Sequence, residues 1–250
     1  ENLFSFSTAQ KVIFSKYIIK INDFAFFKCL YLEYIFIPDD SKLSSIGSCS
    51  FSCSQINEVF FPQYLEELKE NWCYYTPNIY DIIISPDNKN FIFYDQNHTI
   101  VLGKSNKDLD KFDSIVLVNR SVITITIPSF IKYLCSCSLS SCQELKKVEF
   151  QKDSQLISIG SNAFSSSFFK YITIPHSTNI IGKEAFKHCF RIETIEFLGE
   201  NMVFGENCFD SCSDLMLISF PNTQTIKFSE DEFNEVESLL IFTNAYTKFI

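Results

Sequence analysis

The sequence carries a long internal self-similarity. Residues 21–62 superimpose on residues 134–175 by a shift of 113 positions without a gap, so that Cys29 falls on Cys142. Within these segments an apolar residue recurs before Gly or its substitute, at steps of 25, 22, 66, 25, 22, 23 and 24 residues. These marker residues are Ile21, Ile46, Leu68, Leu134, Ile159, Ile181, Phe204 and Phe228. Such a period limits the chain to a fold made of stacked, similar units.

Each unit begins with a bend. Four of the six glycines directly follow a marker residue, where we expect a turn with positive φ: Gly47, Gly160, Gly182 and Gly205. A small residue and an aromatic come next, as in Ala163-Phe164 and Ala185-Phe186. We predict that this pair forms the buried face of a single helical or 3₁₀ turn.

A short strand follows the bend. It is indicated by an apolar triplet whose last two members alternate with period two, such as Ile172 and Ile174. Proline ends many of these strands because it lacks an N–H for the ladder. The prolines concerned are Pro38, Pro62, Pro128, Pro175 and Pro221.

No unit can enclose its own apolar residues, so neighbouring units are predicted to stack, with their strands in a parallel sheet over one continuous core. The signature Ile-Pro, Ile-Gly-x-x-Ala-Phe-x-x-Cys-x-x-Leu resembles the BspA-like branch of leucine-rich repeat proteins, found on bacterial and protozoan surfaces. The resemblance implies an α/β-type solenoid of about 22–25-residue units. Its units would be mostly strand with short helical or 3₁₀ turns.

We expect one leucine-rich repeat domain over residues 1–250, with repeats at about 10–85 and 122–228. Residues 86–121 break the period, and similar interruptions occur in the family that the chain resembles. Residues 228–250 are acidic and loosely in register, as expected of an atypical C-terminal cap.

The interruption has strand signals of its own. Residues 91–94 and 99–102 flank the tetrapeptide Asp-Gln-Asn-His and predict an inserted β-hairpin, and residues 115–118 predict a further strand.

Charge and hydropathy exclude several classes. A net charge of −9 disfavours a nucleic-acid partner, because phosphates are bound by clustered Lys and Arg. The longest apolar runs are about five residues, whereas a membrane span needs roughly 20. The segment neither begins with Met nor carries a leader. We therefore expect targeting signals to lie outside it.

The cysteines and histidines favour packing over chemistry. Cys189 occupies a position filled elsewhere by other small residues, and His188 a neighbouring position held elsewhere by Lys or Ser. A nucleophilic Cys would instead be singular and paired with an oriented base. The members of the Cys position are Cys29, Cys53, Thr76, Cys142, Ser166, Cys189 and Cys212.

Cys135, Cys137 and Cys142 lie close in sequence, but structural zinc normally needs four ligands in paired spacing. Disulfides within pairs such as Cys49/Cys53, Cys208/Cys212 or Cys29/Cys53 are an alternative to free thiols, which packing favours. Nucleotide-binding and hydrolase motifs are lacking. We therefore assign no catalytic, cofactor-binding or metal residue and expect no cofactor.

The outward-facing strand positions remain as a site for a protein ligand. Aromatic side chains beside carboxylates suggest a recognition surface; the alternative is that the rings pack with one another or with a neighbouring repeat. The predicted partner-binding residues are Tyr34, Phe36, Glu58, Phe60, Lys147, Glu149, Tyr171, Thr173 and Glu196.

These observations predict a non-enzymatic module that binds host or cell-surface proteins, as the resemblance implies. We expect it at the cell surface or secreted, a setting that the glycosylation sequons at Asn97 and Asn119 also favour. The alternative is a cytoplasmic repeat scaffold that recruits a protein partner. Oligomeric state is not specified by the sequence.

Overall fold

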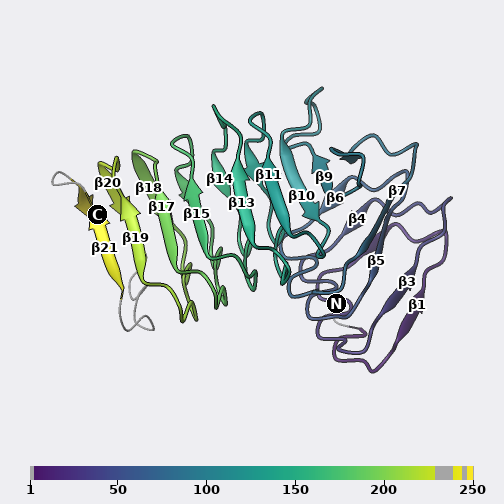
Figure 1. Cartoon of the computed structure of the whole chain (residues 1–250). Helices are drawn as coiled ribbons and strands as arrows, with labels where there is room; N and C mark the ends of the chain where they lie inside the picture. Colours follow the sequence, from purple (N-terminus) through teal and green to yellow (C-terminus); the bar gives the residue numbers. More distant parts are fainter. Residues whose placement is uncertain (1–2, 229–238, 244–246, 250) are drawn as a thin grey trace.

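The computed structural model describes residues 3–228, 239–243 and 247–249. In this part the chain winds as a solenoid of β-strands, and it contains no helix. Each coil has a long strand, a short strand and a run of tight turns, here called the turn side (Figure 1). The stack of coils confirms the predicted solenoid. The expected helical or 3₁₀ turns are wrong, because consecutive turns form the third side instead.

The long strands lie on one side of the solenoid. They are β1 (Lys11–Ile13), β3 (Tyr34–Phe36), β5 (Glu58–Phe61), β7 (Asp81–Ile84), β11 (Thr124–Ile127), β13 (Lys147–Phe150), β15 (Tyr171–Ile174), β17 (Thr194–Phe197), β19 (Leu217–Phe220) and β21 (Leu240–Thr243). The predicted alternation is confirmed: in β11, Ile125 and Ile127 are buried and Thr124 and Thr126 are exposed.

The short strands form the second side. They are β2 (Lys20–Ile21), β4 (Ser45–Ile46), β6 (Glu67–Leu68), β12 (Tyr133–Leu134), β14 (Ser158–Ile159), β16 (Ile180–Ile181), β18 (Asn201–Phe204), β20 (Thr225–Lys227) and β22 (Lys248–Phe249). Most of the marker residues lie in these strands, pointing inward.

The predicted single parallel sheet is divided. The long strands form four sheets, in the orders β1-β3, β5-β7, β11-β13 and β15-β17-β19-β21. The short strands form the sheet β2-β4-β6 and, from β22 to β12, part of a nine-stranded sheet. The pairings between successive coils are parallel, as expected for a solenoid.

The interruption builds the first strands of the nine-stranded sheet. β8 (Ile92–Phe93) and β9 (Ile100–Gly103) pair antiparallel, which confirms the predicted hairpin. β10 (Ser114–Val118) pairs antiparallel with β9 and parallel with β12, so the predicted further strand joins the hairpin to the coils that follow. We call the coils before the interruption the N-terminal stack and those after it the C-terminal stack (Figure 1).

In seven of the described coils the turn side has positive φ at two residues, four positions apart. In the coil after β16 these residues are Glu184 and His188, with φ of 55° and 58°. Each of the two stacks repeats the pattern. No glycine has positive φ, so the expectation for the four glycines is wrong. Gly205 is needed for space instead, because a Cβ there would lie 2.5 Å from the backbone nitrogen of Lys183 in the preceding coil.

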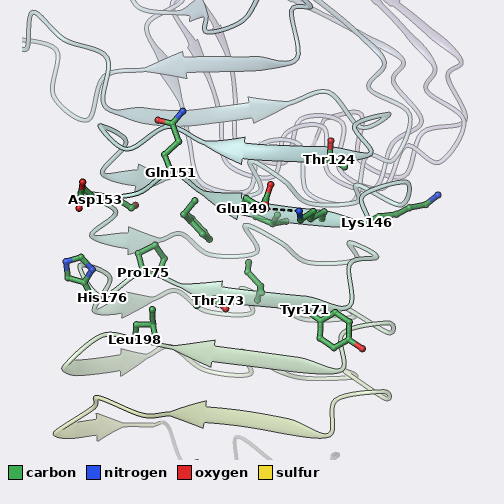
Figure 2. A pocket seen from close by; sticks show the side chains of 15 residues that line it. Thr124, Lys146, Glu149, Gln151, Asp153, Tyr171, Thr173, Pro175, His176 and Leu198 are labelled. Atoms are coloured by element: carbon green, nitrogen blue, oxygen red, sulfur yellow. Dashed lines mark ion pairs between the residues drawn. The ribbon is translucent and has the colours of Figure 1, made fainter.

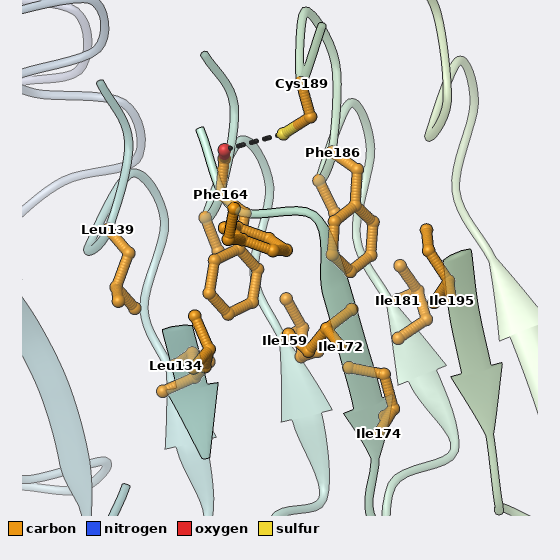
Figure 3. Close-up of a cluster of buried hydrophobic side chains, with 14 of the residues drawn as sticks. Leu134, Leu139, Ile159, Phe164, Ile172, Ile174, Ile181, Phe186, Cys189 and Ile195 are labelled. Carbon is orange, nitrogen blue, oxygen red and sulfur yellow. Dashed lines mark hydrogen bonds between the residues drawn. The ribbon is translucent and has the colours of Figure 1, made fainter. Parts of the chain in front are cut away.

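A ladder of phenylalanine rings packs behind the turns. Phe186 stacks between Phe164 and Phe209, with ring centroids 5.4 and 5.9 Å apart, and all three are fully buried. Leu139 and the strand isoleucines complete this core (Figure 3). A second ladder of rings, Phe4–Phe26–Phe51, lies in the N-terminal stack.

The ends of the chain extend beyond the predicted repeats. Phe4 N and Phe6 N donate to carbonyls of Ala25 and Phe27, so residues before 10 already belong to the turn side of a coil. The predicted cap over residues 228–250 lies largely outside the described residues. Within it, β21 and β22 pair in parallel with β19 and β20.

Candidate functional site

His188 and Cys189 serve the packing of the turn side. The thiol of Cys189 is buried and donates to the Phe164 carbonyl of the preceding coil at 3.1 Å (Figure 3). Burial raises the pKa of Cys189 to about 12, so the thiol is protonated at neutral pH and is a poor nucleophile. His188 is half-buried and stacks on Phe190.

Two of the residues assigned to the Cys position from the sequence do not lie there. Cys53 and Ser166 do not occupy it, because both have a φ of 60° and take the place of His188 in their coils. Ser54 and Ser167 follow them and are buried in its place, and Ser167 Oγ donates to the Leu139 carbonyl as Cys189 does to that of Phe164. In these two coils the Cys position is one residue closer to the next apolar residue. Counting back from that residue therefore gave Cys53 and Ser166 instead of Ser54 and Ser167.

In the described part of the chain, no group of three or more His, Cys, Asp or Glu side chains could hold a metal ion. Cys137 and Cys142 are buried beside the guanidinium of Arg120, whose Nη1 lies 3.9 Å from Cys142 Sγ. A fixed positive charge there disfavours a cation.

The long-strand side is open between β13 and β15. These two strands are neighbours in the stack but belong to different sheets. The connection from Phe150 to Ile159 is two residues longer than the connection from Ile174 to Ile181 in the next coil. The two coils thus differ in perimeter, and the long-strand ladder stops between them.

A groove with a volume of about 860 Å³ lies at this opening (Figure 2). Its floor includes Val148 and Ile172, which are buried members of β13 and β15. Lys146 and Tyr171 lie toward one end, and Asp153 and His176 toward the other (Figure 2). The groove therefore combines an apolar floor with charged and aromatic walls.

Four predicted partner-binding residues line this groove: Lys147, Glu149, Tyr171 and Thr173. Lys147 and Glu149 form an ion pair of 2.7 Å along β13. Tyr171 is 59% exposed, and its hydroxyl donates to Glu193 Oε2 at 2.6 Å.

The fifth residue, Glu196, is placed beside the groove by a hydrogen bond. Thr173 Oγ1 donates to Glu196 Oε2 at 3.2 Å. Its neighbour Glu193 accepts hydrogen bonds from Lys170 and Tyr171, and these lower the pKa of the Glu193 carboxyl below its usual range. Glu193 is thus a carboxylate at neutral pH, hydrogen-bonded to Tyr171 of the groove wall.

The other four predicted residues lie in the N-terminal stack, at the opening between β3 and β5. Phe36 is 44% exposed, and Tyr34 carries the ammonium of Lys11 at 4.5 Å from its ring centroid. Phe60 is half-buried and packs against the N-terminal core, and Glu58 is half-buried beside it on β5. The interruption separates these four residues from the groove (Figure 1).

Sequence reasoning missed several residues of the groove walls. Lys146, Gln151, Asp153, His176 and Leu198 line it but lie outside the strand positions. Their only signal was the 25-residue step followed by a 22-residue step, which marks where the ladder opens.

The sequons lie at the interruption. Asn97 is exposed in the turn between β8 and β9. Asn119 Nδ2 donates to the Tyr80 carbonyl. The described residues include no helix that could cross a bilayer.

Comparisons with known proteins agree with this architecture. A family model described as BspA type Leucine rich repeat region (6 copies) matches residues 1–100 and 110–240. No curated protein matches the sequence.

Solved structures share the fold at low identity. A leucine rich cell surface protein from Faecalibacterium prausnitzii has a TM-score of 0.77 at 17% identity, over 94% of this chain and 60% of that chain. A leucine-rich repeat protein from Bacteroides ovatus has a TM-score of 0.56 at 20% identity, over 97% and 62%. The pneumococcal vaccine antigen PcpA has a TM-score of 0.62 at 12% identity, over 98% and 70%.

The chain thus spans less than two thirds of the first two proteins, and the likeness shows a common fold. The family model covers nearly all of the coils described above. This protein therefore belongs to the BspA-type leucine-rich repeat family.

Proposed function

We propose that this chain is a non-enzymatic module that binds a protein ligand, a host or cell-surface protein, through its long-strand side. The groove between β13 and β15 carries the proposal, because it exposes an apolar floor beside Tyr171 and two ion-paired or hydrogen-bonded carboxylates, Glu149 and Glu196. Tyrosine is among the residues that contribute most to protein interfaces.

The size of the groove fits side chains of a partner rather than a whole element. Its polar walls can fix the orientation of a docked chain while the floor removes apolar surface from water. The aromatic cluster of Tyr34, Phe36 and Phe60 offers a second contact area on the N-terminal stack.

A non-catalytic role is supported by the state of the nucleophile candidates. Cys189 is buried with a raised pKa, and His188 lies in a turn position without a carboxylate to orient it among its described contacts. The proposed setting is the cell surface or secretion. Two proteins of this fold, the Faecalibacterium cell surface protein and the PcpA antigen, are named as surface or vaccine proteins.

Binding can be tested with the purified chain and intact animal cells by flow cytometry, before and after the cells are treated with protease. We expect the Tyr171→Ala/Glu149→Lys variant to bind at least about tenfold more weakly than the parent chain. Tyr75→Ala is the matched control, because Tyr75 is 44% exposed on the turn side. Equal binding by all three proteins, or binding insensitive to protease, contradicts the proposal.

The setting has its own test. An antibody to this segment should label intact producing cells without permeabilisation. Labelling only after permeabilisation would favour the cytoplasmic scaffold instead.

A further inference from the structure

The two stacks meet on the turn side at a seam, where residues 69–76 lie against residues 135–142. Elsewhere the turn sides of successive coils are joined by backbone hydrogen bonds, such as Phe51 N to Trp72 O at 2.9 Å and Leu139 N to Ala163 O at 2.8 Å. The equivalent bond from Cys73 N to Ser138 O is missing at the seam. Side chains take its place.

The Ser138 carbonyl is occupied by other donors. It accepts from Val118 N at 2.9 Å and from Arg120 Nη1 at 2.8 Å. On the neighbouring pair, Asn71 N donates to the Ser136 hydroxyl at 3.0 Å instead of to a carbonyl. At the seam, side chains therefore replace backbone hydrogen bonds that join successive coils elsewhere on the turn side.

Cys73 stands where the aromatic ladder would continue. Its position in the coil corresponds to that of Phe51 before it and Leu139 after it. The smaller side chain leaves room for Cys137, whose sulfur lies 3.4 Å from the sulfur of Cys73. Both residues are fully buried, and both thiols are reduced in the structure.

Arg120 is held against this pair. Its guanidinium is buried and donates to the carbonyls of Val118, Ser138 and Cys137 at 3.1, 2.8 and 3.0 Å. Nη2 lies 3.7 Å from Cys73 Sγ. A buried cation favours the thiolate form of a neighbouring cysteine.

The Cys73 thiol responds to these neighbours. Burial by itself opposes its ionisation, but the hydrogen bond with Cys137 and the charge of Arg120 together lower its pKa. Burial raises the pKa of Cys137 well above the usual value. The two sulfurs and the Arg120 guanidinium thus form one buried cluster at the seam.

We propose that Cys73 and Cys137 are a disulfide site that joins the two stacks when the chain folds in the presence of a disulfide oxidant such as oxidised glutathione. The thiolate of one of the two cysteines attacks one glutathione sulfur and releases one glutathione thiolate. The other cysteine, losing its proton, then attacks the protein sulfur of this mixed disulfide and releases the second glutathione. Two protein thiols and one oxidised glutathione become one protein disulfide and two reduced glutathiones.

The two sulfurs are already in contact at 3.4 Å. The sulfurs must approach by about 1.4 Å to reach the length of a disulfide bond. Because both are buried, the exchange takes place before the seam closes during folding. The bond would close a loop of 64 residues that includes the whole interruption, which restricts the unfolded chain strongly.

Mass spectrometry of the full chain tests the site. The chain is refolded in a mixture of reduced and oxidised glutathione, free thiols are alkylated after denaturation, and the protein is digested with trypsin. We expect residues 70–89 linked to residues 133–146, with fragmentation that locates the bond at Cys137. A melting temperature several degrees above that of the reduced chain should accompany it.

Variants separate the three cysteines of the second peptide. The link should persist in Cys135→Ser and disappear in Cys73→Ser and Cys137→Ser. Fragmentation of the parent peptide decides the question even if a variant fails to fold. Complete alkylation of Cys73 in the oxidised folded chain, or a bond from Cys73 to Cys135 or Cys142, overturns the proposal.

Discussion

The two stacks contain the same pair of coils, one of 25 residues and one of 22, but present different surfaces. In both, the long-strand ladder stops between the members of the pair, at β3/β5 and at β13/β15. The solenoid therefore opens at the same step of the repeat pattern in both stacks. The side chains at the opening determine whether its surface is aromatic or polar.

The 113-residue shift pairs the surface residues of the two openings. Phe36 corresponds to Glu149, and Phe60 to Thr173. In the N-terminal stack, Phe60 packs back onto the core. In the C-terminal stack, the shorter polar residues stand beside an open groove over Val148 and Ile172. One backbone arrangement thus yields an aromatic surface in one copy and a polar-walled groove in the other.

The largest effect should come from the aromatic ladders. Phe186→Ala is expected to lower the free energy of unfolding by about 3–5 kcal/mol, because it removes a fully buried ring between two others. Phe26→Ala should cost less, since its neighbour Phe4 is 50% exposed. Chemical denaturation measures both. An equal or larger loss for Phe26→Ala would show that the two ladders do not differ in this way.

The seam should be the next most sensitive point. Arg120→Met is expected to cost about 2–3 kcal/mol, because three buried carbonyls lose a charged donor. Calorimetry should then resolve separate transitions for the two stacks. Arg191→Met is the matched control, because Arg191 is exposed over the Phe168 ring. A single transition at the parent temperature would mean that Arg120 does not couple the stacks.

Glycine substitutions should affect both stacks alike. Gly47→Ala and Gly205→Ala are each expected to cost about 1–3 kcal/mol, since the added Cβ would meet backbone at 2.4 and 2.5 Å. At Gly103 the nearest atom belongs to the Val116 side chain, so Gly103→Ala should cost less. Thermal melts of the three variants compare these costs, and a neutral Gly47→Ala would show that neighbouring coils can separate without loss.

Exchanging the paired surface residues should give the smallest effects on stability. Phe60→Thr is expected to cost about 1–2 kcal/mol through lost apolar burial, and Thr173→Phe to change stability by less than about 0.5 kcal/mol. Thr173→Phe should nevertheless weaken binding to intact cells by narrowing the groove. Unchanged binding by a stable Thr173→Phe variant would move the contact surface away from β15.

Much of the fold was predictable from the spacing of a few residue types. The marker residues and the alternating triplets placed the strands, because a side chain that recurs once per coil must face the same interior each time. The hairpin was equally predictable, since two apolar runs flank a short polar turn.

The turn side was less predictable. A small residue followed by Phe fits one helical turn as well as a series of β-turns. What distinguishes the two is positive φ at residues such as Glu184 and His188, and because these are not glycines the sequence gives no sign of it. The glycines were misread for the same reason. They are required by the close approach of the neighbouring coil, a distance between residues more than twenty positions apart in the chain.

The sequence by itself determined that this protein is a solenoid, how long each coil is and which strand side chains face inward, because these follow from period and alternation. Only the tertiary structure decided where ladders stop, that a groove opens between β13 and β15, and that Cys73, Arg120 and Cys137 meet at the seam. Those features depend on packing between coils of unequal perimeter and between segments that the interruption separates in the chain. No local pattern encodes that fit.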